Sequence, residues 1–151
     1  MNELQLKLCD IQGRLFELSA DRSYGSANFV KVFMTSEVAK ALDSTYNRMQ
    51  WAGEEYLLEE LEAIADGKLI KGGEVYSKDT LYWLGYLYRY WHYFTNESSG
   101  AIYKQAPVGT MKRNYLMFHT MTPELAIEDL KEIFKQKNQI KFENIERTKI
   151  V

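Results

Sequence analysis

The segment from Lys78 to Phe94 constrains the fold more than any other part of the chain. Eight aromatic residues surround it on nearly every side of a helical projection: Tyr82, Trp83, Tyr86, Tyr88, Tyr90, Trp91, Tyr93 and Phe94. Ser77 precedes the segment as an N-cap, and Asp79 suits the positive end of a helix. A helix that is apolar all round is usually buried in a bundle. The sequence therefore predicts a central helix that other helices enclose.

Apolar residues elsewhere also recur at helical spacing. A stripe spaced alternately by four and three residues runs from Asn2 to Ala20: Leu4, Leu8, Ile11, Leu15 and Leu18. This stripe predicts a helix packed on the core, although it also fits a short heptad seam for a dimer or a partner helix. Further long helices are predicted over 45–67, 111–121 and 123–137, with shorter ones between residues 26 and 42 and between 98 and 106.

The chain of 151 residues has the length of one domain. No segment shows a strand pattern, and the chain has only two prolines, so we expect an all-α fold. The prediction is a single domain over 1–151, a compact multi-helix bundle of six to seven helices. From 138 to 151 apolar residues alternate irregularly with charges, so this tail is predicted as a short strand, a frayed helix or a flexible segment.

Composition excludes several classes of protein. Hydrophobic residues make up 46% of the chain and charged residues 26%, which excludes wholesale disorder. The net charge of −2 gives no general attraction to nucleic acid or to anionic lipid. The charges are uneven, with 8 basic and 13 acidic residues through Val75, and 11 basic and 8 acidic residues from Tyr76 onward. Opposite halves could therefore attract each other, within one molecule or between two.

Cysteine usage and apolar runs indicate a cytoplasmic protein. Cys9 is the only cysteine, so the chain forms no internal disulfide and no zinc site of several thiolates. Charged residues interrupt the first twenty positions, which excludes a secretory apolar region there. The longest apolar run, from Leu81 to Tyr88, is far shorter than the ~20 residues that a membrane span needs. We therefore expect no contact with a membrane.

The segment 36–51 resembles a helix-turn-helix. Three side chains of types that pair with base edges lie on its expected second helix: Asn47, Arg48 and Gln50. Asp43 stands where such a turn normally has glycine, and Glu54 and Glu55 follow where they would repel phosphate. An ordinary helical corner is therefore favoured over DNA reading, which stays as the alternative.

An acidic run on the 45–67 helix is a second candidate. The run consists of Glu54, Glu55, Glu59 and Glu62, in which Glu55 shares a helical face with Glu59 or with Glu62. The last three are candidate Mg²⁺ ligands, and the pattern resembles the first metal helix of the all-α nucleoside triphosphate pyrophosphohydrolases. That family requires a second helix with Glu and Asp three residues apart, whereas the following helix here offers only Asp79. A solvated acidic face is the favoured interpretation, and no metal is expected.

Arg89 and His92 lie within the aromatic helix and form the third candidate. A buried cation must be paired, because an unpaired charge in the interior costs several kcal/mol. We expect Glu54, Glu55 or Glu59 to supply the carboxylate, with a bound anion or a partner carboxylate as the alternative. Arg89, His92, Glu55 and Glu59 are therefore predicted as a structural or interaction cluster. The sequence offers no nucleophile beside a base and no spaced pair of histidines, so we predict no catalytic residue and no cofactor.

Three segments resemble a small uncharacterised all-helical bacterial family, namely Met49–Glu60, Tyr82–Trp91 and Met111–Tyr115. The resemblance covers about 29–134, and such proteins occur in loci that resemble toxin–antitoxin modules. It implies a non-catalytic bacterial protein that acts through protein–protein interaction, as an antitoxin-like component. A protein partner or self-association is expected. A helix-turn-helix DNA-binding regulator is the first alternative, and a magnesium-dependent nucleotide pyrophosphohydrolase-like enzyme is the second.

Overall fold

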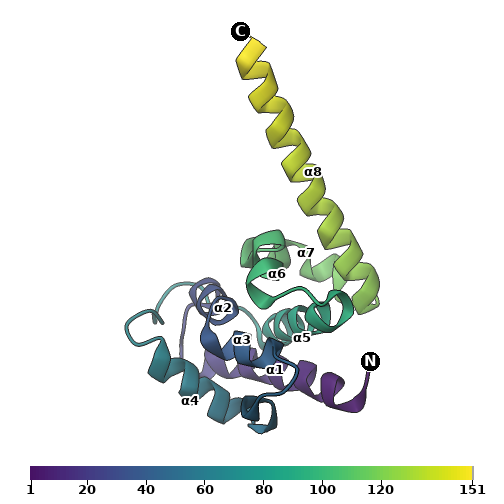
Figure 1. Ribbon diagram of the computed structural model, residues 1–151. Coiled ribbons are helices and arrows are strands. Elements are labelled where there is room, and N and C mark those ends of the chain that lie inside the picture. The colour runs from purple at the N-terminus through teal and green to yellow at the C-terminus, as the bar shows by residue number, and fades with distance from the viewer. Residues whose placement is uncertain (151) are drawn as a thin grey trace.

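The computed structural model describes residues 1–150, which form an all-helical fold without a strand (Figure 1). The elements are α1 (Glu3–Asp21), α2 (Ser26–Met34), α3 (Glu37–Asp43), the 3-10 turn η1 (Arg48–Trp51), α4 (Glu54–Ile64), α5 (Lys78–Thr95), α6 (Ser99–Gln105), α7 (Val108–Phe118) and α8 (Pro123–Ile150). The predicted all-α class is confirmed. The described residues contain eight α-helices, more than the six to seven predicted.

Helices α1 and α5 pack against each other through two glycines. A Cβ atom on Gly85 would overlap the backbone carbonyl oxygen of Gln12, and one on Gly13 would lie 2.7 Å from the Tyr82 ring. The side-chain amide of Gln12 donates to the carbonyl oxygen of Gly85 at 2.9 Å, which joins the two helices directly. This close approach places the polar residues of α1 and α5 beside each other inside the core.

The aromatic helix α5 is central but is not enclosed on every side. Tyr88 and Trp91 are fully buried, whereas Tyr82 and Tyr90 lie half-buried along one edge. The Tyr82 hydroxyl donates to Asp10 at 2.6 Å, and the Tyr90 hydroxyl donates to Glu124. Tyrosine buries its ring while its hydroxyl reaches a polar partner, so a helix with aromatics all round need not be buried all round. The expectation of complete enclosure is therefore wrong.

The predicted helix over 45–67 is divided in two. Residues 45–47 are not helical, η1 makes one 3-10 turn, and α4 begins only at Glu54. The Asn47 side chain accepts from the Met49 amide at 2.9 Å, and Gly53 stands in extended conformation before α4. These two caps start new helical segments where the apolar spacing alone predicted one helix.

The described part of the C-terminal tail is a helix, one of the three predicted alternatives, and not the short strand or the flexible segment. Helix α8 continues without a break to Ile150, where the last helix was expected to end near Lys137. Val151, the remainder of the predicted tail, lies outside the described residues. In Figure 1, α8 leaves the body and projects away from it as a single helix. Residues 124–150 contain neither glycine nor proline, so nothing in the chain stops the helix.

The two ends of α8 have different surroundings. Near its start, Ala126, Ile127 and Leu130 are fully buried against the body. From 135 to 149, which we call the distal half of α8, every side chain is exposed. Along residues 1–150, no helix combines the length and the apolar character that crossing a membrane requires.

Candidate functional site

Arg89 lies fully buried at the centre of the molecule. Its Nη1 donates to Oδ1 of Asp43 at 2.6 Å, and its Nε donates to Oε1 of Gln12 at 2.8 Å. Its Nη2 donates to Oγ of Ser99 at 3.2 Å. All three guanidinium nitrogens are therefore bonded, and four residues from α1, α3, α5 and α6 meet at this cluster.

Asp43 is the carboxylate that neutralises Arg89. Its Oδ1 also accepts from the Ser99 hydroxyl at 2.7 Å, and its Oδ2 accepts from the Ser99 amide at 2.8 Å. The prediction of a partner on the 45–67 helix is wrong. Helix α4 turns Leu57, Leu58 and Leu61 into the core, so Glu55 and Glu59 fall on its exposed outer face and take no part in the cluster. Asp43 ends α3, and sequence reasoning had considered it only as a turn residue.

His92 lies beside Asp43 and thus in the cluster of Arg89, but without Glu55 and Glu59, which the prediction placed there. Its Nδ1 is 2.6 Å from the carbonyl oxygen of Glu97 and 3.6 Å from Oδ1 of Asp43. A carbonyl oxygen only accepts, so Nδ1 carries the proton and, in the neutral ring, Nε2 is left as an acceptor. His92, Asp43 and Tyr93 line a polar pocket of about 290 Å³, and the buried Tyr93 hydroxyl has no hydrogen-bond partner among the residues described. The His92 ring and the Tyr93 hydroxyl can form hydrogen bonds with a molecule in this pocket. The one carboxylate that lines the pocket, that of Asp43, is already paired with Arg89.

A second polar cluster fixes the base of α8. The Glu97 carboxylate accepts hydrogen bonds from Lys131 of α8 and from Gln105 of α6, and the Trp91 indole donates to it at 3.3 Å. Burial tends to raise the pKa of Glu97, but these hydrogen bonds, with a further one from Thr95, outweigh it and lower the pKa to about 2. The carboxylate is therefore charged and holds α8 to α5 and α6.

Two of the three predicted DNA-reading side chains are engaged within the protein. Asn47 caps η1, and the amide of the buried Gln50 donates to the carbonyl oxygens of Leu42 and Ser44. Arg48 is exposed. The expected second helix of a helix-turn-helix is a 3-10 turn of 4 residues, so that element of the interpretation is wrong. A turn of this length does not present the face with which a recognition helix enters the major groove.

The three carboxylates proposed as metal ligands do not gather at one site. Glu62 accepts from Arg22 at 3.0 Å and from the Tyr24 hydroxyl at 2.6 Å, whereas Glu55 and Glu59 face solvent. Across residues 1–150, no three His, Cys, Asp or Glu side chains are grouped so that they could hold a metal ion.

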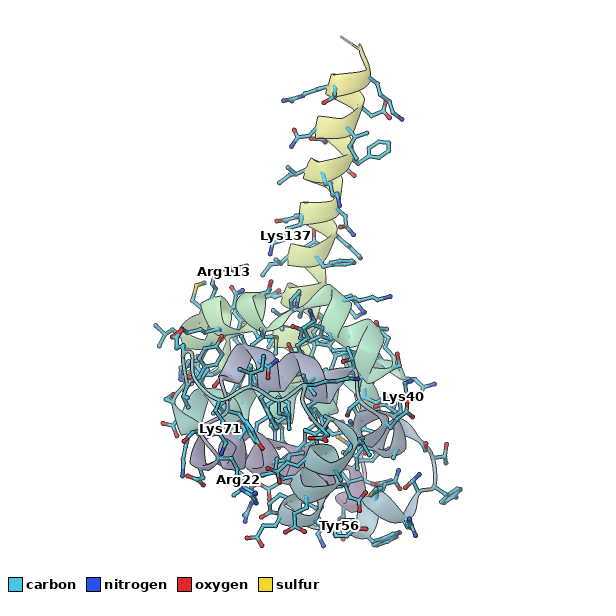
Figure 2. The ribbon with its side chains drawn as sticks, turned by 90° about the vertical axis from the view of Figure 1, so that its left-hand side faces the viewer. Arg22, Lys40, Tyr56, Lys71, Arg113 and Lys137 are labelled. Atoms are coloured by element: carbon cyan, nitrogen blue, oxygen red, sulfur yellow. The ribbon has the colours of Figure 1, made fainter. Side chains whose placement is uncertain are left out.

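The distal half of α8 is a surface that sequence reasoning missed. It exposes three large apolar side chains, Ile140 at 58%, Phe142 at 58% and Ile145 at 45%. Five basic residues accompany them, against only Glu143 and Glu146: Lys135, Lys137, Lys141, Arg147 and Lys149. Figure 2 shows these side chains extending from α8 on several sides, with Lys137 near the body. The feature of the sequence that could have predicted this surface is the uninterrupted run of helix-compatible residues after Pro123, because it indicates that the last helix continues to the end of the tail.

The chain matches no protein-family model, no curated protein and no solved structure.

Proposed function

We propose that this protein is a non-enzymatic protein-binding module and that the distal half of α8 is its binding element. One observation carries the proposal: fifteen consecutive residues, 135–149, form a helix whose side chains are all exposed and which displays Ile140, Phe142 and Ile145. An isolated helix of about 12–15 residues is marginally stable in water, and most helices owe their stability to tertiary packing. A partner would supply the packing that this segment lacks within its own chain.

The arrangement of α8 supports binding in two ways. The Glu97–Lys131 ion pair and the buried Leu130 fix its first turns to the body, so the distal half is presented in a constant direction. Full burial of an Ile or Phe side chain stabilises a complex by roughly 1.5–3 kcal/mol. Phe142 and Ile145 are three residues apart and share one face of the helix, whereas Ile140 lies on another face. A single partner can therefore bury Phe142 and Ile145 together, which offers substantial binding energy. This mode of recognition, a helix with apolar anchors, is common in protein partners.

The buried polar clusters support a structural rather than a catalytic role for Arg89 and His92. Each guanidinium nitrogen of Arg89 has a partner within the core, and the side chain is fully buried, so a substrate does not reach it. The antitoxin-like role in a bacterial locus, implied by the family resemblance, is a narrower form of the proposal. In that form the distal half of α8 would bind a cognate protein and block it.

A position-specific photo-crosslink tests the proposal. The photoreactive amino acid p-benzoylphenylalanine replaces Phe142 in one variant and Leu116 in a control, because Leu116 is 79% exposed but lies on α7. After irradiation in cells that produce the protein naturally, we expect one discrete protein adduct from position 142 and none from position 116. Equal adducts at both positions, or no discrete adduct at position 142, would contradict the proposal.

A further inference from the structure

The outer face of α4 has the opposite character to the distal half of α8. Residues 48–67, which include η1 and α4, contain six carboxylates and one basic residue, Arg48. Glu55, Tyr56 and Glu59 are exposed along α4, and Trp51, 77% exposed, precedes them in η1. We call Trp51, Glu55, Tyr56 and Glu59 the acidic face. It combines exposed aromatic rings with negative charge, whereas the distal half of α8 combines exposed apolar side chains with positive charge.

We propose that the distal half of α8 in one copy docks on the acidic face of a second copy, which joins the copies head to tail. This inference rests on the proposed function, because it names the partner of the same helix. The charges are complementary: the distal half carries five basic and two acidic residues, whereas residues 48–67 carry six acidic residues and one basic residue, the exposed Arg48. Complementary charges steer the encounter and fix its orientation, and the apolar side chains provide the burial.

The charges on both surfaces are free to pair across an interface. Lys135, Lys141 and Lys149 make no ion pair or hydrogen bond within the described part of the chain, and the same holds for Glu55 and Glu59. The charged residues that serve the fold, such as Glu62 with Arg22, lie outside this set. These five charged residues can therefore pair across an interface without losing an internal contact, whereas Lys137 donates to the Thr110 hydroxyl at 3.3 Å.

The fold prevents the two surfaces from meeting within one copy. Helix α8 is continuous from Pro123 to Ile150, and its 28 residues extend roughly 42 Å at about 1.5 Å per residue. Figures 1 and 2 both show it projecting from the side of the body opposite α4, with Tyr56 at the far end of the body from Lys137. A straight helix cannot bend back over the body, so the contact requires a second copy.

The two surfaces differ, so the contact is heterologous. Each copy keeps one unoccupied α8 and one unoccupied acidic face at the ends of a growing assembly, unless the chain of copies closes into a ring. We therefore expect species larger than a dimer to appear as the protein concentration rises, and we expect added salt to shift them toward the monomer.

A charge-swap experiment by sedimentation velocity tests this inference. One variant reverses the helix (Lys135→Glu, Lys141→Glu and Lys149→Glu), a second reverses the acidic face (Glu55→Lys and Glu59→Lys), and a third combines all five changes. Every changed side chain is exposed, so far-ultraviolet circular dichroism and the melting temperature should stay those of the wild type.

We expect the wild type to associate with rising concentration and each single-surface variant to weaken association about tenfold or more. The combined variant should associate again, because the three carboxylates introduced on its helix can pair with the two lysines introduced on α4. A mixture of the two single-surface variants should also associate, because each supplies the complement of the other.

Three results would overturn the inference. A wild type that stays monomeric at every concentration would exclude a second copy as the partner, while a crosslink from position 142 to a different protein would leave the proposed function standing. Association that survives reversal of the helix, or that the combined variant fails to restore, would place the contact elsewhere. Binding of duplex DNA by the monomeric wild type, lost on reversal of the helix, would assign the basic helix to nucleic acid instead.

Discussion

Helices α5 and α8 both carry cations, but the two helices use them in opposite ways. Arg89 of α5 is fully buried, and Asp43, Gln12 and Ser99 bind its three nitrogens. The lysines of the distal half of α8 stand in solvent beside exposed apolar side chains. A buried charge must have its partners in its own chain, whereas an exposed charge leaves its partner undetermined. The first helix therefore organises the fold, and the second is available for binding.

The largest expected effect comes from removing the buried cation. Arg89→Ala leaves Asp43 without its counter-charge in the core, which should lower the free energy of unfolding by ~3–5 kcal/mol. Chemical denaturation measures the change. The control is Arg48→Ala, which removes an exposed arginine and should change stability by no more than ~0.5 kcal/mol. Equal stability of the two variants would show that Arg89 is not a structural residue.

The next effect tests the close approach of α1 and α5. Gly85→Ala places a Cβ atom against the backbone of Gln12, which cannot move aside as a flexible side chain would. We expect a loss of ~1–3 kcal/mol in unfolding free energy. Gly100→Ala in α6 is the matched control, because nothing lies within 4 Å of its added Cβ atom. A neutral or stabilising Gly85→Ala in denaturant titrations would mean that the two helices lie further apart.

Glu97, which holds α8 to the body, should make the stability of the protein depend on pH. The pKa of Glu97 is lowered from its usual 4.5 to about 2, so the folded state favours the charged form. Its stabilisation is present above about pH 4.5 and is lost as the pH falls toward 2. We expect Glu97→Gln to cost about 1–2 kcal/mol at neutral pH, a figure reduced for the partial exposure of the carboxylate. Thermal melts of both proteins across this range should show the difference closing at low pH, and a constant difference would contradict the assignment.

The smallest expected effect on stability comes from removing the distal half of α8, which, unlike α5, we expect to contribute little to the fold. Ending the chain before Gln136 removes side chains that are exposed from 136 to 149, so the body should keep its unfolding free energy within ~0.5 kcal/mol. Leu130→Ala, in the buried part of the same helix, should cost ~2–5 kcal/mol. If the truncation destabilised the body as much as Leu130→Ala does, the distal half would be part of the fold rather than a surface added to it.

Local patterns predicted much of the helical structure. The expected helices over 2–20 and 78–94 correspond closely to α1 and α5, because a regular apolar stripe and a serine cap are local signals. The predicted helix over 45–67 failed because Asn47 and Gly53 start new segments, which periodicity does not register. The apolar pattern of the tail did not distinguish a strand, a helix and a flexible segment, for the opposite reason. Its apolar residues are irregular, but its uninterrupted helix-compatible sequence continues α8.

The candidate sites depended on contacts that a single sequence does not reveal. The need for a carboxylate beside Arg89 was predictable from burial alone, and Arg89 and His92 lie beside the same carboxylate, although the predicted Glu55 and Glu59 take no part. The identity of that carboxylate, Asp43, could not be predicted. Asp43 lies 46 residues from Arg89 along the chain, and its contact with Arg89 depends on how α3 and α6 pack on α5. Glu55 and Glu59 were nearer candidates along the chain, but the leucines of α4 turn them outward.

Amide hydrogen exchange of the distal half of α8 tests the central claim most directly. In dilute protein we expect the amides of 138–149 to exchange rapidly through local opening, while those around Trp91 exchange far more slowly. Under conditions where sedimentation or crosslinking shows a complex, the amides of 138–149 should be protected about tenfold or more, with no change around Trp91. Equal exchange of 138–149 in the free protein and in the complex would contradict the claim that this helix is the binding element.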